Sequence, residues 1–244
     1  MTFPQFKDKH QFDALVSAEQ LLSYQKSLGR VPEGPCPTRV ILCYQSSFME
    51  RVVATHKGLF SSGVFRRLYW LNDAPGVAIG EYGIGAPRVV LSMEMMIAWG
   101  VKEFISIGTA GAIAPDLKPG DLVGCDRAIR DEGTSHHYLP AGRYSYPTDN
   151  GEFAKKFQRV GTSWTLDAFF RHTKEEIATY QKEGVLTVEM EASAVFAIGQ
   201  MRGVSVGAGF VISDLLYEEG WNPQFRKEPV EQGLDSLLQM AVGK

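Results

Sequence analysis

The chain has 244 residues, with 25 basic and 28 acidic side chains and a formal net charge of −3. Hydrophobic residues make up 44% and charged residues 22%, which is typical of a globular chain and excludes a disordered or collagen-like protein. The sequence has no basic stripe, so we expect no nucleic acid partner. The longest apolar run, 203–212, is too short to span a bilayer, no secretory leader pattern opens the chain, and three scattered cysteines suit a reducing compartment. These features predict a cytoplasmic protein without membrane contact.

The chain begins with a helical pattern. After it, short apolar runs that predict strands alternate with further helical patterns. A helical pattern lies within 12–28 and is followed by three prolines that predict a loop. We predict strands over 39–44, 68–71, 77–81, 104–107, 121–125, 186–188 and 204–212, and helices over 47–55, 87–99, 173–183, 192–201 and 230–242. This alternation predicts an α/β fold with a largely parallel sheet. We divide the chain into a lead-in helix and loop (1–38) and a single domain (39–244).

Two glycine-rich stretches follow predicted strands, Gly83–Pro87 and Gly108–Gly111. Ligands of open α/β sheets bind at the carboxyl ends of strands, where glycine allows backbone N–H groups to approach an anion or a sugar. Tight turns without a ligand are an equal alternative. The first stretch lacks the third glycine of a dinucleotide fingerprint, so we do not expect a nicotinamide-dependent dehydrogenase.

Three segments carry a resemblance to a known family. They read Ser-Ile-Gly-Thr-Ala-Gly-Ala-Ile at 106–113 with Pro-Gly-Asp at 119–121, Val-Glu-Met-Glu-Ala-Ser-Ala at 188–194, and Val-Ile-Ser-Asp at 211–214. In this order and spacing the chain resembles the purine nucleoside phosphorylase/uridine phosphorylase family, which includes nucleosidases, from about residue 39 to 225. The resemblance implies a three-layer α/β/α fold with a mixed central sheet, cleavage of an N-glycosidic bond and assembly as a homo-oligomer.

The resemblance assigns Glu191 to the 2′- and 3′-hydroxyls of a ribose. A carboxylate can accept both hydrogen bonds at once. Met190 is expected to pack its thioether on the sugar, and Glu189 to lie beside the same site. For both glutamates the alternative is a structural role at a helix N-terminus, where acidic residues complement the helix dipole.

The resemblance also assigns the contacts to the base. Asp214 follows a long apolar strand and is the expected general acid, which protonates a purine near N7 as the base departs, with Ser213 orienting it. A carboxylate capping the next turn is the alternative for Asp214. Phe169 or Phe170 is expected to stack on the base, although either could equally belong to the core.

The phosphate site departs from the pattern of the family. Phosphorylases hold phosphate with arginines, yet Met49 and Ser106 stand at the two usual arginine positions, and of the usual set Thr109 remains, beside Gly108. Substitute cations could come from four arginines on or near the predicted pocket loops: Arg51, Arg88, Arg130 and Arg171.

Three functions are therefore open. We predict a phosphorylase that uses inorganic phosphate as co-substrate and no cofactor, because the segments around Arg130 and Gly161 look like the phosphorylase branch. The segment 130–138 also looks like the loop that borders the pocket in related sequences. A nucleosidase would use water, with Glu50 as its general base. A non-catalytic nucleoside-sensing domain would keep the pocket without turnover.

Two further details concern histidines and chain length. The adjacent His136 and His137 would point to opposite faces of a strand, so we expect no metal site there. His10 could contact the pocket of a neighbouring subunit. Between Phe157 and Gln158 the family normally has another helical turn and a strand, so this chain is either trimmed at that point or incomplete.

Overall fold

The computed structural model describes residues 3–6, 9–217 and 220–243. Its helices are α1 (Ala18–Ser27), α2 (Ser46–Thr55), α3 (Ala86–Trp99), α4 (Ser135–Tyr138), α5 (Lys174–Lys182), α6 (Ala192–Arg202) and α7 (Glu228–Val242), with short 3₁₀ turns η1 (Lys9–Gln11), η2 (Gly63–Phe65), η3 (Ala154–Lys156) and η4 (Phe169–Arg171). Its strands are β1 (Arg39–Cys43), β2 (Gly58–Phe60), β3 (Leu68–Leu71), β4 (Val77–Glu81), β5 (Glu103–Ala112), β6 (Leu122–Asp131), β7 (Tyr144–Ser145), β8 (Arg159–Leu166), β9 (Thr187–Glu189), β10 (Ser205–Tyr217) and β11 (Gly220–Pro223).

The strands form one mixed sheet in the order β11-β10-β6-β8-β9-β5-β1-β4-β3-β2, with β7 on β6. Strand β10 also pairs with β5, so β5, β10, β6, β8 and β9 close into a ring. Strand β1 is parallel to both β4 and β5, whereas β5 is antiparallel to β9 and β10 is antiparallel to β6. The predicted mixed sheet is therefore observed.

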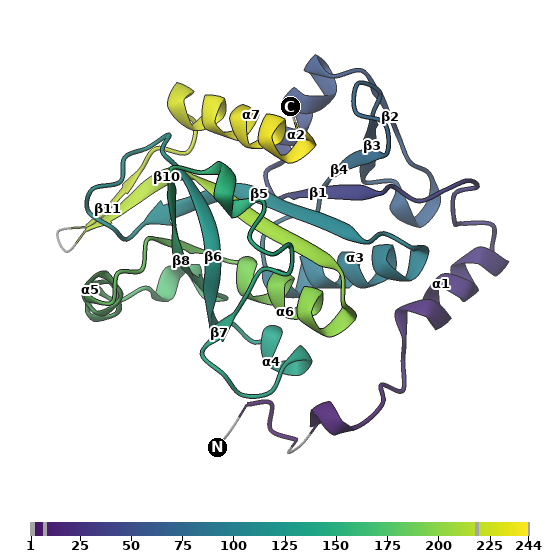
Figure 1. Ribbon diagram of the computed structural model, residues 1–244, viewed down its shortest axis with the longest axis horizontal. Coiled ribbons are helices and arrows are strands. Elements are labelled where there is room, and N and C mark those ends of the chain that lie inside the picture. Colours follow the sequence, from purple (N-terminus) through teal and green to yellow (C-terminus); the bar gives the residue numbers. More distant parts are fainter. Residues whose placement is uncertain (1–2, 7–8, 218–219, 244) are drawn as a thin grey trace.

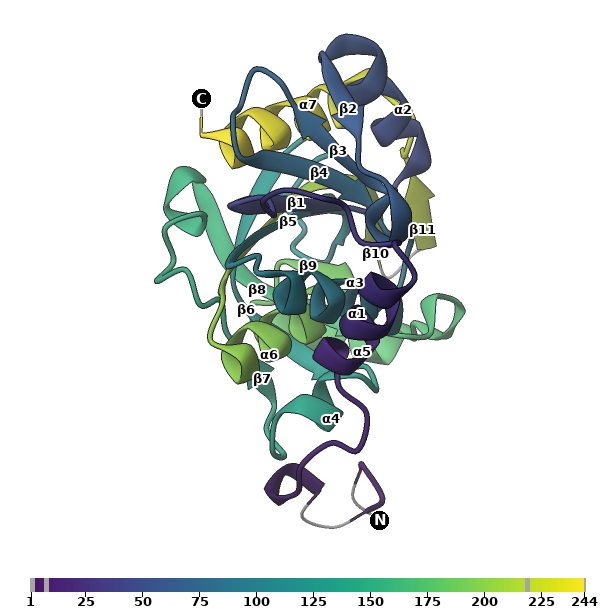
Figure 2. The same ribbon diagram turned by 90° about the vertical axis from the view of Figure 1, so that its right-hand side faces the viewer.

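Helices cover both faces of this sheet because its central strands are apolar on both sides. Along β1, Val40 and Leu42 point into one core with residues of α3 and α6, and Ile41 and Cys43 point into a second core with α2 and α7. Figures 1 and 2 show α7 and α2 on one side of β1 and β5, and α3, α6 and α1 on the other. This arrangement is the predicted three-layer α/β/α fold.

Strands β5, β6 and β10 continue at least five residues beyond their predicted ends, and the extension of β5 gives one glycine-rich stretch a different structure from the predicted turn. Strand β5 runs to Ala112, so Gly108 and Gly111 lie inside a strand and not in a turn after it. A Cβ on Gly111 would lie 2.4 Å from a methyl of Leu216 and 3.0 Å from Oδ2 of Asp214. The small residues of β5 therefore allow side chains of neighbouring strands to approach its backbone closely.

Other departures are local. His136 and His137 lie on the short helix α4 and not on a strand, so the reason given above for their directions was wrong. At the predicted shortening, η3 leads into β8 through Phe157 and Gln158 alone. Over the described ranges, no helix combines the length and apolar character needed to cross a bilayer. The division at residue 38 stays a prediction, although α1 packs against α3 through Leu22.

Candidate active site

One cavity of about 530 Å³ collects most of the residues expected in the site, and its size suits a small organic ligand. It is formed where β1, β8 and β9 end, together with the C-terminal parts of β5 and β10 and the loop before α3. Its lining residues are Tyr44, Gln45, Ile84, Thr109, Ala110, Gly111, Leu166, Phe169, Phe170, His172, Val188, Glu189, Met190, Glu191, Ser213, Asp214, Trp221 and Phe225. The structure thus brings together segments that are more than 150 residues apart in the sequence.

Glu191 is the N-cap residue of α6 and is buried in the wall of the cavity. Its Oε1 accepts a hydrogen bond of 2.6 Å from the backbone N–H of Gly85. Gly85 has a φ of +112°, which favours glycine, so the glycine-rich loop before α3 serves to orient this carboxylate. Burial, and then the charge of Glu189, raise the pKa of Glu191 to about 8.

Glu189 also reaches the cavity wall, but the protein itself occupies its carboxylate. Oε1 accepts from the hydroxyls of Ser163 and Thr165, and Oε2 accepts from the backbone N–H groups of Glu191 and Ala192. Burial raises the pKa of Glu189, although these four hydrogen bonds oppose that effect. The carboxylate therefore fixes the start of α6, in line with the helix N-terminus alternative.

Asp214 lies at a bulge of β10, where the register against β5 shifts between Ile212 and Asp214. The bulge places both Ser213 and Asp214 in the cavity wall, and Asp214 is 4% exposed. Its Oδ1 accepts from the Ser213 hydroxyl at 2.7 Å and its Oδ2 accepts from the Trp221 indole at 2.8 Å. The predicted contact between Ser213 and Asp214 is therefore present in the structure.

Aromatic side chains form the wall near Asp214. Phe169 makes edge contacts with Trp221 and His172, with ring centroids 5.9 and 5.6 Å apart. Phe170 also lines the cavity but is 92% exposed, so Phe169 is the better placed of the two for a buried contact with a base. Trp221 further contacts Phe225, which follows β11.

Sequence reasoning did not single out His172, Trp221 or Phe225. Trp221 and Phe225 reach the cavity because β11 folds back along β10. The aromatic residues after Asp214 were visible in the sequence, but their direction depends on a hairpin that the sequence analysis did not predict. His172 follows η4 by one residue, and no motif marked it.

At the end of β1, neutral groups occupy the region where the family has arginines. The hydroxyls of Tyr44 and Ser106 are 2.6 Å apart, and Gln45 Nε2 donates to Thr109 Oγ1 at 2.8 Å. Met49 is buried in the core between α2 and α7. Gly108 does not line the cavity, and a Cβ there would lie 3.0 Å from the Tyr44 ring.

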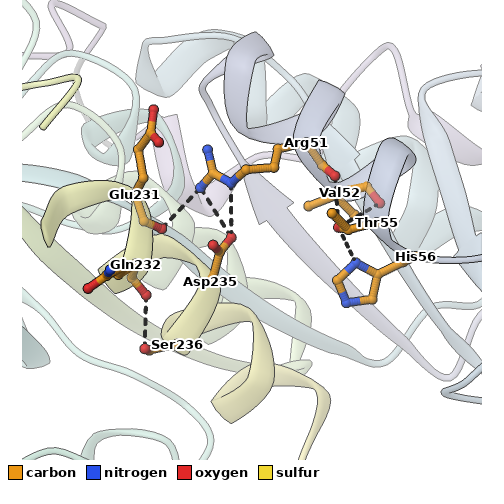
Figure 3. A network of polar contacts seen from close by, with 8 residues as sticks. All are labelled: Arg51, Val52, Thr55, His56, Glu231, Gln232, Asp235 and Ser236. Carbon is orange, nitrogen blue, oxygen red and sulfur yellow. Dashed lines mark hydrogen bonds and ion pairs between the residues drawn. The ribbon is translucent and has the colours of Figure 1, made fainter. Parts of the chain in front are cut away.

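The four arginines expected to replace the missing charges do not line this cavity. Arg51 faces α7, where its Nε and Nη2 donate to Asp235 Oδ1 and its Nη2 also donates to the Glu231 carbonyl (Figure 3). Arg130 is buried and donates to Ser135 and to loop carbonyls after it. Arg88 packs its guanidinium over Gly83, and Arg171 is exposed on η4. The expectation that these arginines complete the anion site is not supported within this chain.

Glu50 and the segment 130–138, which were also expected at the site, lie outside the cavity. Glu50, the possible base for a water nucleophile, is an exposed residue of α2 that lines a separate hollow with Arg66 and Arg67. The segment 130–138 does not border the cavity. It is fastened to α6 instead, because Glu132 Oε1 accepts from the Ser193 hydroxyl at 2.8 Å.

The remaining histidines bond within the chain. His10 Nε2 lies 2.9 Å from the His136 carbonyl oxygen, and His137 Nδ1 lies 2.7 Å from Lys9 Nζ. In the part of the chain that the structure describes, no group of three or more histidine, cysteine, aspartate or glutamate side chains is arranged to hold a metal ion. The expectation that no metal is required stays a prediction.

Comparison with known proteins agrees with this geometry. The family profile described as the phosphorylase superfamily matches residues 51–239. The guanosine phosphorylase of Halorubrum lacusprofundi is 30% identical over 148 residues, which are 56% of this chain and 60% of the relative. A DeoD-type purine nucleoside phosphorylase of Bacillus cereus is 28% identical over 179 residues, which are 67% of this chain and 76% of the relative.

Solved structures show the same fold. Uridine phosphorylase from Vibrio fischeri ES114 superposes with a TM-score of 0.72 at 21% identity and covers 87% of this chain and 93% of its own. Purine nucleoside phosphorylase from Toxoplasma gondii, in complex with immucillin-H, gives 0.72 at 20% identity and covers 85% and 89%. Nucleoside phosphorylases are pentosyltransferases, the enzyme class predicted from the sequence. With the family profile matched over most of the chain, the predicted family is confirmed: the chain belongs to the phosphorylase superfamily.

Proposed function

We propose that the protein cleaves the N-glycosidic bond of a purine nucleoside with inorganic phosphate and releases the free base and ribose 1-phosphate. The observation that carries this proposal is that two buried carboxylates, Glu191 after β9 and Asp214 on β10, line one cavity together with a wall of aromatic rings. Relatives named as guanosine and purine nucleoside phosphorylases support the purine assignment.

In this proposal Glu191 holds the ribose. Its Oε1 is fixed by the Gly85 N–H, and in its ionised form the carboxylate accepts hydrogen bonds from the 2′- and 3′-hydroxyls. Met190, the next residue in the wall, packs against the sugar. Glu189 acts through Glu191, because it binds the backbone N–H of that residue.

Asp214 acts as the general acid. The C1′–N9 bond breaks, its electron pair stays on the base, and a proton from the Asp214 carboxyl is transferred to N7. The Ser213 hydroxyl can rotate, so it can donate to the carboxylate or accept from the carboxyl as the proton leaves and returns. Phosphate forms the new bond to C1′.

Phosphate is assigned to the end of β1. The first turn of α2 begins directly after Gln45, whose side chain makes no capping hydrogen bond, and the backbone N–H groups at a helix start can bind an anion. The Thr109 hydroxyl and Gln45 Nε2 lie beside this helix start. Backbone and neutral donors would then hold phosphate in place of the arginines.

Hydrolysis is the second candidate, and one observation favours it. Of the described residues that line the cavity, none is lysine or arginine, and the buried Gln45 Oε1 has no hydrogen-bond partner. A carbonyl oxygen suits a water molecule, whose hydrogen it can accept, better than a phosphate dianion.

The test is base release from inosine, adenosine, uridine and 5′-methylthioadenosine, each with and without phosphate. Formation of ribose 1-phosphate only when phosphate is present supports phosphorolysis. Free ribose at the same rate without phosphate shows hydrolysis. Asp214→Asn is the matched variant, and we expect it to reduce base release by about 10²–10⁴-fold while leaving nucleoside affinity nearly unchanged. If both the wild-type protein and Asp214→Asn bound nucleosides but neither released a base, the result would favour the nucleoside-sensing function.

Assembly as a homo-oligomer and a cytoplasmic location are further parts of the proposal. They rest on the family resemblance and on composition. Sedimentation of the purified chain tests the first, and cell fractionation tests the second.

A further inference from the structure

His172 lines the cavity and has a buried polar atom without a hydrogen-bond partner. Within the described part of the chain, two cavity-lining side chains have a buried polar atom without a hydrogen-bond partner: Gln45, at Oε1, and His172, at Nε2. Gln45 follows β1, in the region assigned to phosphate, and His172 follows β8 beside the aromatic wall. A buried nitrogen without a partner is costly, so a ligand that bonded His172 would remove an existing penalty.

Two aromatic residues on different elements hold the imidazole in place. The ring packs edge-on against Trp164 of β8 at 5.3 Å and against Phe169 of η4 at 5.6 Å. Trp164 is fully buried and its indole donates to Asp131, so this support is rigid. The direction of the His172 ring is thus set before any ligand arrives.

The carboxylate of Asp214, whose charge acts on His172, is already paired. Both oxygens of Asp214 accept hydrogen bonds from Ser213 and Trp221. Burial lowers the pKa of His172, so the ring is neutral near pH 7, with one N–H donor and one acceptor nitrogen. The charges of Glu176 and Asp214 oppose this effect, because a nearby negative charge favours the protonated ring.

We propose that His172 determines the specificity for the base: its Nε2–H donates a hydrogen bond to the carbonyl oxygen at C6 of a 6-oxopurine. A 6-aminopurine places an amino group at this point, and the two donors would then face each other. The inference rests on the proposed function for the identity of the ligand, a purine base, but not on turnover.

The test compares the affinities of the free bases hypoxanthine and adenine by calorimetry, without phosphate. We expect the wild-type protein to bind hypoxanthine about tenfold or more tightly than adenine, as the loss of one buried hydrogen bond implies. His172→Ala should weaken hypoxanthine binding and bring the ratio of the two affinities close to one. His172→Gln, which carries an amide N–H at a similar reach, should restore much of the ratio.

A matched control separates this effect from a general loss of packing. Phe170→Leu alters another lining residue of the same loop without a polar group, and should change both affinities alike. A wild-type preference for adenine, or a ratio that His172→Ala leaves unchanged, would overturn the inference. Failure of the wild-type protein to bind either base would overturn it as well. Retained base selectivity in a protein that releases no base from nucleosides would support the inference and refute only the proposed function.

Discussion

The indole Nε1–H of Trp221 donates a hydrogen bond of 2.8 Å to Oδ2 of Asp214. Trp221 belongs to β11, which pairs antiparallel with β10 so that Asp214 is the partner of Pro223 in the register. The hairpin therefore brings a neutral donor to the proposed general acid, on the oxygen opposite to the one that Ser213 binds. Both carboxylate oxygens are oriented, which fixes the carboxyl plane relative to the cavity.

The first prediction concerns this contact. Trp221→Phe keeps an aromatic ring in the wall but removes the donor. A hydrogen bond to a charged group contributes roughly 1.5–3 kcal/mol, so we expect kcat to fall about tenfold or more. The nucleoside KM should change little, because the ring surface remains. Steady-state kinetics with the best nucleoside substrate measures both values.

Phe225→Leu is the control for Trp221→Phe. Phe225 lines the same cavity and contacts Trp221, but no hydrogen bond links it to Asp214. We expect it to raise KM more than it lowers kcat. Equal effects of both variants on kcat would show that the wall acts by packing alone.

Much of the fold followed from local pattern. The continuous apolar run of β1 and the periodic apolar faces of α3 and α7 could be predicted from the sequence because each depends on nearby residues. The C-terminal end of β5 could not be predicted in this way. Glycine is a weak strand former, and Gly111 lies in a strand because Leu216, Val188 and Asp214 close on it from neighbouring strands. Such contacts are decided by tertiary packing.

The candidate site divides in the same way. Glu191 and Asp214 stood out because they belong to short blocks with a recognisable order. His172 reaches the cavity through packing against Trp164, and Trp221 reaches it through a hairpin, so neither carries a local signal. Arg51 is a cation close in sequence to the expected phosphate loop, but its position on α2 directs its side chain to α7.

A second prediction uses the burial of Glu191. The pKa of this residue is raised from 4.5 to about 8 by burial and by the charge of Glu189, so the folded protein holds a proton that the unfolded chain releases above 4.5. Stability therefore falls as the pH rises from about 4.5 to 8, with a slope of at most about 1.4 kcal/mol per pH unit from this group. Glu191→Gln removes this titrating group, so the variant should lose less stability than the wild-type protein between pH 4.5 and 8.

Urea unfolding of both proteins at pH 5 and pH 8 measures this difference. The comparison uses the change between the two pH values within each protein, so a constant effect of the substitution cancels. An equal change in wild type and Glu191→Gln would mean that Glu191 is ionised throughout this range.

A third prediction concerns Arg51. Its pair with Asp235 is partly exposed, with side-chain exposures of 25% and 50%, so we expect Arg51→Ala to reduce the free energy of unfolding by at most about 1 kcal/mol. Because Arg51 does not line the cavity, the KM for phosphate should not change. Asp235→Asn is the matched variant on α7. If Arg51→Ala greatly increased the phosphate KM and Asp235→Asn did not, the result would show that Arg51 contributes to phosphate binding.

The last prediction separates the two nucleophiles at Gln45. Gln45→Glu places a carboxylate next to Thr109 with little change in volume. Two negative charges about 4 Å apart repel by up to about 4 kcal/mol at a protein surface, so a phosphorylase should show an increase of at least about tenfold in the phosphate KM. For a nucleosidase the same carboxylate can take a proton from the attacking water, and release without phosphate should be maintained or rise. Gln45→Met, which removes the amide without adding charge, is the control. If Gln45→Glu and Gln45→Met gave the same phosphate KM, the nucleophile would have to bind away from the end of β1.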